Sequence, residues 1–488
     1  ADIIFDADFL QYWKQEHETF TPQGIALLTG GPIDIAEYRA EMAARPEHEQ
    51  HMHGARCNCQ RRDGMSRQFA LGATVMASRK QKPEELDKLI QQGIKECTMH
   101  EVGHTLGLRH NFRASAYYSL EELNDPEKTA ETGLGMSVMD YNPTNIVPSG
   151  MKQGDYFSQT IGPYDIWAIE YGYKPLKGGS PEGELPELEK IAGRSGDPRY
   201  AFGSDGNARG IDPDPHTVRY DLSNDLIEYA KAEAQLVAES WPNVVDDLTK
   251  DGEGYQKARR AFNTLIARHG QVMFGAARYI GGVNVSRSHK GDEGAPEPMV
   301  VVPAEKQREA LALVEEQVFS DKPFSFPPEL YSYLAASQWD HWGVDSVERV
   351  DYPAHGTILM WQDRILSKLL SPLTLSRMCD AELKVPEDED VLTSAELLQR
   401  LTKSIFAETD DFKAGEYTER KPAISSLRRN LQRSYLKRMS ELALGRTSAP
   451  QDCATVAYVE LADLKKRIDT ILGGDFELDV YSRAHLQE

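Results

Sequence analysis

The sequence has few cysteines, an excess of acidic over basic residues, and no long apolar run. Its 488 residues include 5 Cys, which is too few for a disulfide scaffold and leaves at least one thiol unpaired within the chain. Lys and Arg number 55 against 77 Asp and Glu, a formal net charge of −22. This charge repels nucleic acid and anionic membrane surfaces, so neither is expected as a main partner. No apolar run approaches the roughly 18–20 residues of a membrane span, so no span is expected.

What is present suits a folded protein of two or three domains. Apolar residues make up 40% of the chain, and 21 Tyr, 15 Phe and 6 Trp can build a core. The chain starts at Ala1 without Met and without a signal peptide, and it continues directly into strand-like residues. We therefore expect a processed or truncated product whose targeting segment is missing.

Helix signals are clearest before residue 100 and after residue 225. Pro83 stands at a favoured first-turn position, and the apolar residues after it recur at spacings of three or four. Gly93 could divide this stretch into two helices. Further helices are expected over residues 304–319 and along an apolar stripe after Pro422. The apolar positions of that stripe are Ile424, Leu427, Leu431, Tyr435, Met439 and Leu442. The basic residues beside it, Arg428 among them, are expected to form a solvated face.

One motif carries chemistry. Residues 100–110 read His-Glu-Val-Gly-His-Thr-Leu-Gly-Leu-Arg-His, which is H-E-x-x-H-x-x-G-x-x-H. On a helix, residues i and i+4 share a face, so His100 and His104 can direct two imidazoles at one point. Gly107 allows a left-handed turn that ends the helix, after which His110 can supply a third nitrogen. Three protein ligands leave one position open for water, the pattern of a catalytic rather than a structural zinc site.

Glu101 is the expected general base. It follows the first ligand and can reach a water on the metal without binding the metal itself. The composition of the chain would produce the whole motif by chance only on the order of 10⁻⁴ times. We therefore expect one catalytic Zn²⁺ held by His100, His104 and His110.

A second motif lies downstream and points to a family. Residues 137–141 read Ser-Val-Met-Asp-Tyr. Together with the histidine motif, this segment resembles the Met-turn of the metzincin zinc endopeptidases, and its S-x-M-x-Y form is similar to the astacin and serralysin branches. The resemblance implies that Met139 forms the floor of the site. It also implies that Tyr141 approaches the zinc, where its phenol could ligate the metal or donate a hydrogen bond to an oxyanion.

The wider chain resembles bacterial zinc-dependent metalloproteases with a helical C-terminal domain, over residues 104–115, 162–169, 281–282 and 303–319. The resemblance implies an α+β metzincin-like catalytic domain (1–175), a connector (176–224) and a mainly α-helical C-terminal domain (225–488). It also implies a location outside the cytoplasm, whether periplasmic, cell-surface or secreted. Metzincins place several strands before the zinc helix, and few are found in residues 1–99, so the catalytic domain is expected to lack upstream strands.

Weaker groups of possible ligands leave alternatives open. His51, His53, Cys57 and Cys59 could form a second zinc site, or a loop near the active site with one thiol pairing to Cys97. One of these thiols could also reach the catalytic zinc as an inhibitory thiolate.

A cluster of aspartates, Asp205, Asp212, Asp214 and Asp221, could hold calcium. Its spacing fits no EF-hand, and a solvated acidic loop is the favoured interpretation. His216, His289 and His355 are expected to be structural.

The sequence thus predicts a zinc-dependent endopeptidase that hydrolyses peptide or protein substrates with a metal-bound water activated by Glu101. One alternative is a non-catalytic surface or binding protein that retains a metzincin zinc site, although the intact Glu101 argues against it. A second alternative is a gluzincin-type peptidase with Glu121 or Glu127 as the third ligand.

Overall fold

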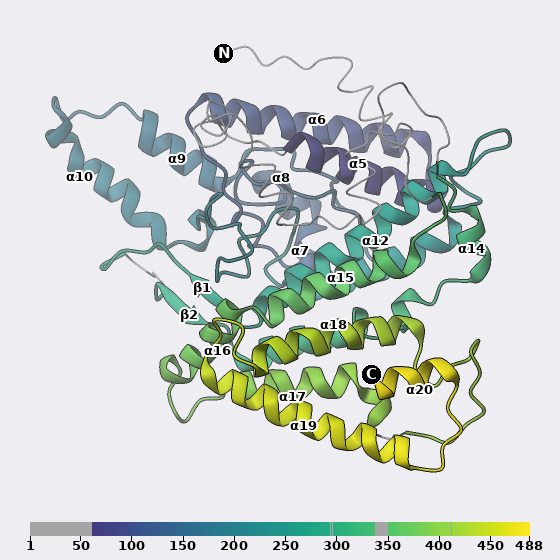
Figure 1. The fold of residues 1–488 in the computed structure, drawn as a ribbon. Helices are drawn as coiled ribbons and strands as arrows, with labels where there is room; N and C mark the ends of the chain where they lie inside the picture. The colour runs from purple at the N-terminus through teal and green to yellow at the C-terminus, as the bar shows by residue number, and fades with distance from the viewer. Residues whose placement is uncertain (1–60, 293, 295, 337–349, 411) are drawn as a thin grey trace, which may run out of the picture.

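The structure is a computed structural model that describes residues 61–488, except 293, 295, 337–349 and 411. The described part is built mainly from helices (Figure 1). The α-helices are α5 (Arg61–Ser78), α6 (Pro83–Thr105), α7 (Leu120–Leu123), α8 (Pro126–Thr132), α9 (Pro163–Tyr173), α10 (Pro181–Ala192), α11 (Leu226–Ser240), α12 (Gln256–Ala276), α13 (Ala304–Gln317), α14 (Pro328–Tyr333), α15 (Ala354–Leu369), α16 (Pro372–Lys384), α17 (Ser394–Ile405), α18 (Ser426–Ala443), α19 (Gln451–Gly473) and α20 (Val480–Gln487).

The helices are stacked in layers (Figure 1). Helices α5 and α6 lie together at the top of the view, and α5 contacts α12 beneath it. Helix α12 packs on α11 and α15, α15 packs on α18, and α18 packs on α19 at the bottom of the view. This order lets each helix cover the apolar face of the next.

Two apolar cores join residues on both sides of the expected domain boundaries. One core contains Met136 together with Leu311, Leu401 and Leu464. The other joins Phe69 of α5 to helices α6, α11 and α12. The division into residues 1–175, 176–224 and 225–488 stays a prediction, and within the described residues the first and last of these parts share their cores.

Helix α6 begins at Pro83 as expected and runs without a break through Gly93. The expectation that Gly93 could divide it is wrong, for a packing reason. A Cβ at Gly93 would lie 2.4 Å from Cζ of Phe69 on α5. The glycine is therefore the point of close approach between α5 and α6, and this contact outweighs its low helix propensity.

The chain between α6 and α9 has little regular structure, and polar side chains of α6 bind its backbone. Gln92 Oε1 accepts a hydrogen bond from the N–H of Tyr156 (2.7 Å), and Glu96 Oε2 accepts one from the N–H of Ser158 (2.6 Å). Both α6 side chains are buried. Buried N–H groups need acceptors, and here α6 supplies them where a neighbouring strand would otherwise do so.

The expected α+β catalytic domain is therefore not observed in the described residues. In the described residues the strands are β1 (Val283–Val285) and β2 (Met299–Val301), which pair antiparallel with Val283 opposite Val301. This hairpin lies after residue 175, and the described residues 61–175 form helices with irregular connections. No helix of the described part combines the length and apolar character needed to cross a membrane.

The helices expected after residue 225 are confirmed, with one correction. Helix α13 opens after Pro303, and α18 buries Leu431, Tyr435 and Met439 along the expected stripe. Arg428 of α18 is not part of a solvated face, because it is only 7% exposed. Its Nε donates to Glu408 Oε1 (2.7 Å), so a carboxylate compensates the buried charge.

A buried ion pair between α11 and α12 generates a stability prediction. Arg268 Nε lies 2.5 Å from Glu233 Oε2, with side chains 2% and 4% exposed. Glu233→Ala should lower the free energy of unfolding by about 3–5 kcal/mol, because it leaves a buried guanidinium uncompensated. Asp469→Ala is the control: it breaks the Lys465–Asp469 pair, whose side chains are 73% and 57% exposed, and should cost less than about 0.5 kcal/mol. Urea denaturation measures both, and equal losses would contradict the prediction.

Candidate metal centre

Three histidine side chains converge at the C-terminal end of α6. His100 and His104 stand one turn apart on the helix, and His110 follows the helix end. One ligand atom from each lies within 4.8 Å of the others. Within the described residues, no other group of three or more His, Cys, Asp or Glu side chains is placed to hold a metal ion. The structure thus brings together the three histidines that the motif predicts.

The turn after α6 is the one the motif requires. Gly107 adopts a φ of +86°, in the left-handed region. Its N–H donates to His104 O (3.0 Å), and the N–H of Leu108 donates to Gly103 O (3.0 Å). This pair of bonds is a Schellman motif, which satisfies the last carbonyls of the helix and reverses the chain toward His110.

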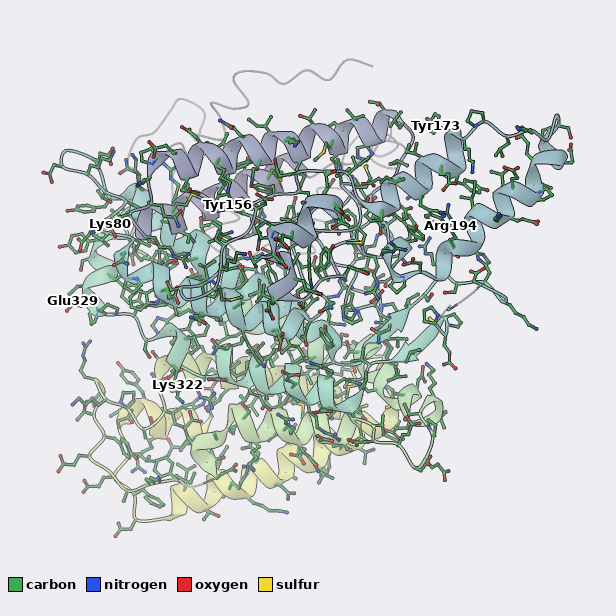
Figure 2. All side chains as sticks on the ribbon, turned by 180° about the vertical axis from the view of Figure 1, so that it is seen from behind. Lys80, Tyr156, Tyr173, Arg194, Lys322 and Glu329 are labelled. Atoms are coloured by element: carbon green, nitrogen blue, oxygen red, sulfur yellow. The ribbon has the colours of Figure 1, made fainter. Side chains whose placement is uncertain are left out.

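Helix α9 contacts the same end of α6. The hydroxyl of Tyr173 donates to Leu106 O at 2.9 Å. Figure 2 shows Tyr173 at the end of α9, beside the last turn of α6. One more carbonyl at the helix end thereby gains a donor.

Each imidazole has an acceptor at Nδ1. His100 Nδ1 lies 2.7 Å from Val138 O, His104 Nδ1 lies 3.0 Å from Leu108 O, and His110 Nδ1 lies 2.9 Å from Asp205 Oδ2. A carbonyl or carboxylate oxygen can only accept, so each Nδ1 carries the proton. A neutral ring with its proton on Nδ1 has its lone pair on Nε2, the atom that can bind a metal.

The Nε2 atoms fit a single small dication. His104 Nε2 and His110 Nε2 are 3.1 Å apart. Two nitrogens bound to one tetrahedral zinc at 2.0–2.1 Å are separated by about 3.3 Å. With both Nδ1 atoms protonated, neither Nε2 can donate to the other, and a cation bound by both nitrogens would stabilise their close approach. The donor set is therefore suited to zinc.

Met139 lies directly beneath the zinc-motif helix. It is 0% exposed, and a Cβ at Gly103 would come within 2.3 Å of its Sδ. Its carbonyl accepts the N–H of Asn111 (3.0 Å), which ties it to the chain just after His110. The thioether packs where only a glycine of α6 leaves room.

Asp165, at the start of α9, fixes the segment that carries Met139. Its carboxylate accepts from Ser137 Oγ (2.5 Å), the N–H of Val138 (2.8 Å) and the N–H of Gly162 (2.9 Å). Burial raises the pKa of Asp165, while these hydrogen bonds counteract the rise. The same peptide segment presents Val138 O to His100, so Asp165 orients the first imidazole through one intermediate residue.

Tyr141 reaches the histidines with its hydroxyl. The Tyr141 Oη atom lies 3.0 Å from His110 Nε2, and the side chain is 1% exposed. Because His110 Nδ1 donates to Asp205, Nε2 accepts here and the phenol O–H is the donor. The ring also packs edge to face on Phe112, with centroids 5.0 Å apart.

The expected general base and the two alternative glutamate ligands differ in their placement. Glu101 follows His100 on α6 and is half-buried. Glu121 on α7 and Glu127 on α8 are exposed and do not belong to the group of three histidines. The arrangement therefore does not favour a gluzincin-type third ligand.

Asp205 is a site residue whose role was not predicted from the sequence. Beyond His110, its Oδ1 accepts from Arg219 Nη2 at 3.0 Å. Burial favours a higher pKa for Asp205, but the hydrogen bond from His110 and the charge of Arg219 outweigh burial and lower it. The sequence offered only its membership in an aspartate cluster, which gave no link to His110.

The other aspartates of that cluster do not form one metal site within the described residues. Asp214 accepts from Arg113 Nη1 (3.3 Å) and from the N–H of His216 (3.0 Å). The expected solvated acidic loop is wrong for Asp214 and Asp221, which are 3% and 5% exposed. Burial raises the pKa of Asp221 to about 7, although Arg278, Arg268 and Arg113 act against the rise.

The remaining histidines make ordinary polar contacts or lie at the surface. His216 Nε2 is 3.1 Å from Tyr279 Oη, His355 Nε2 is 2.8 Å from Ser426 Oγ, and His289 is exposed. The predictions for His51, His53, Cys57 and Cys59 fall outside the described residues.

A comparison of the sequence with protein-family models agrees with the geometry of the site. A family model described as Met-zincin matches residues 82–412, from the start of the zinc-motif helix to beyond α17. The chain belongs to the Met-zincin family. Searches of curated proteins and of solved structures found no match. The predicted metzincin resemblance is thus confirmed, whereas the likeness of this Met-zincin to the astacin and serralysin branches stays a prediction.

The Asp205 contact predicts how tightly the site holds zinc. Asp205→Asn should weaken zinc binding by about 10- to 100-fold, because the carboxylate that orients His110 and raises its basicity is lost. Asp197→Asn, in the same connector, is the matched control; its carboxylate pairs with Arg199 near the surface. Competition with a chromophoric chelator measures both dissociation constants. Equal values for Asp205→Asn and the wild type would show that the contact has no such role.

Proposed function

We propose that this Met-zincin is a zinc-dependent endopeptidase acting on peptide or protein substrates. The observation that supports it most is the set of three Nδ1 hydrogen bonds, which leaves Nε2 unprotonated on three rings whose ligand atoms lie within 4.8 Å of one another. In the proposal, His100, His104 and His110 hold a single Zn²⁺. When bound, zinc supplies a Lewis acid for the scissile carbonyl and for a water molecule.

Glu101 is proposed as the residue that moves the proton. It follows a proposed ligand on the helix, and its side chain is half-buried and therefore partly accessible. A carboxylate there can take a proton from the attacking water and return it to the leaving amine.

Tyr141 is proposed to hold the developing oxyanion. Its O–H donates to His110 Nε2 in the structure. Once that lone pair is used for metal binding, the hydroxyl needs another acceptor, and the substrate carbonyl oxygen is the one the reaction provides. Met139 is proposed as the floor that sets the depth of the site beneath α6.

The proposal places the protein outside the cytoplasm in a bacterium, as the resemblance implies.

Glu101→Gln tests the chemical step. The variant should bind zinc as tightly as the wild type but cleave peptides about 10²- to 10⁴-fold more slowly, because the amide cannot take the proton. Zinc content by mass spectrometry and cleavage of a broad peptide library measure the two effects. The control is Glu121→Gln on the exposed face of α7, which should change neither quantity. A zinc-loaded wild type that cleaves nothing would instead favour a non-catalytic binding protein.

Tyr141→Phe tests oxyanion stabilisation. The turnover number should fall about 10²- to 10³-fold, with KM and zinc content little changed, because only a hydrogen bond made in the transition state is lost. Tyr164→Phe is the matched control, since it removes the hydroxyl of a ring that stacks on Phe202. A rise in KM with an unchanged turnover number would assign Tyr141 to substrate binding instead.

A further inference from the structure

Two cysteine side chains meet between α16 and α19, away from the zinc motif. Cys379 Sγ on α16 lies 3.6 Å from Cys453 Sγ in the first turn of α19. The two residues are 74 positions apart in the sequence. Both helices lie in the lower part of Figure 1, where α16 stands beside the start of α19.

The distance between the sulfurs is about that of van der Waals contact. A disulfide requires about 2.05 Å, so the sulfurs would need to approach by about 1.5 Å. A cysteine sulfur moves by such a distance when its side chain rotates about χ1. The pair is thus close enough for a direct covalent bond.

The two thiols differ in access. Cys379 is half-buried, whereas Cys453 is 0% exposed and belongs to the main apolar core. The hydroxyl of Ser394 lies 3.5 Å from Cys379 Sγ. Burial raises the pKa of Cys453 to about 11, with Ser394 acting against the rise and Cys379 adding to it. An external reagent therefore meets Cys379 first.

We propose that Cys379 and Cys453 are a modification site at which a disulfide cross-links α16 to α19. The cross-link is independent of the proposed peptidase activity, because α16 and α19 lie in the lower part of Figure 1 and the zinc-motif helix α6 at its top.

The bond forms by thiol–disulfide exchange with a small-molecule disulfide or a disulfide-bearing oxidoreductase. The Cys379 thiolate attacks one sulfur of the oxidant, whose sulfur–sulfur bond breaks and releases a thiolate. Cys453 then loses its proton and attacks Cys379 Sγ in the mixed disulfide, which releases the second thiolate. In total, two protein thiols lose two electrons and two protons, and the oxidant is reduced to two thiols.

The cross-link would close a long loop around the C-terminal helices. Helix α17 packs against both α16 and α19, and α18 packs against α19. Helix α16 also holds the connector, because Arg377 donates to Ile211 O. A disulfide here restricts the conformations of the unfolded chain between Cys379 and Cys453. Because this lowers the entropy of the unfolded state, the folded state becomes relatively more stable. Such bonds persist in oxidising compartments, in agreement with the expected location outside the cytoplasm.

Peptide mapping of the full chain tests the proposal without any substitution. The protein is equilibrated with oxidised glutathione or with dithiothreitol, alkylated after denaturation and digested with trypsin. Cys379 falls in the tryptic peptide 378–384 and Cys453 in 447–465, and neither peptide contains another cysteine. The oxidised sample should contain these two peptides joined, at a mass lower by two hydrogen atoms than their sum.

The thermal midpoint gives an independent measurement. The oxidised chain should melt about 5–10 °C above the reduced chain. Cys379→Ser and Cys453→Ser should each abolish both the joined peptide and the response of Tm to the oxidant, whereas the control Cys97→Ser, on α6, should preserve them. Alkylation of both Cys379 and Cys453 in the oxidised sample, bonding of either to a different cysteine, or a joined chain that melts no higher than the reduced one would overturn the proposal.

Discussion

The orientation of three imidazoles depends on three hydrogen-bond acceptors that come from separate segments of the chain. Leu108 O belongs to the turn at Gly107, Val138 O to the segment held by Asp165, and the Asp205 carboxylate to the connector after α10. A histidine presents Nε2 to a metal only when Nδ1 keeps its proton, so each acceptor fixes both the direction and the tautomer of one ring. The centre is thus as well ordered as the three segments that supply these oxygens.

Helix α6 holds most of these segments, and it does so with polar residues as well as apolar packing. Gln92 and Glu96 accept N–H groups of the chain that leads into α9. Both acceptors are buried together with the N–H groups that they bind, so these hydrogen bonds avoid the cost of leaving buried polar groups unsatisfied. Gly93 and Gly103 lie on the same helix where Phe69 and Met139 approach most closely. One helix therefore supplies two metal-ligand candidates, acceptors for the loop beneath them, and the space into which Met139 packs.

Local patterns predicted the parts of the site that local sequence determines. The start of α6 at Pro83, the pairing of His100 and His104, and the turn at Gly107 follow from helix geometry and backbone preference. Asp205 could not be found in this way, because it lies 95 positions from His110 and meets it only through the tertiary fold.

Two of the expectations that failed, for Arg428 and for Gly93, share a related cause. The apolar stripe of a helix shows which face is buried, but it does not show that Arg428, on another face, packs against the carboxylate of Glu408. Glycine propensity likewise says nothing of the Phe69 ring that requires Gly93 in α6. In both cases tertiary contacts decided the outcome.

The helical region after residue 225 also constrains the chain next to Tyr141. Tyr220 has a φ of +63°, a left-handed conformation that costs a bulky residue about 1–3 kcal/mol. Its N–H donates to Tyr141 O (2.9 Å), and its carbonyl accepts from Arg268 Nη1 of α12 (3.0 Å). Gly64 on α5 leaves space for the phenol, since a Cβ there would lie 1.6 Å from Tyr220 Oη. Because strain at one residue persists only where its surroundings enforce it, α5 and α12 together fix the backbone from which Tyr141 reaches His110. The C-terminal helices are in this sense part of the framework of the centre, and the position of Tyr141 is set by residues on both sides of the expected domain boundary.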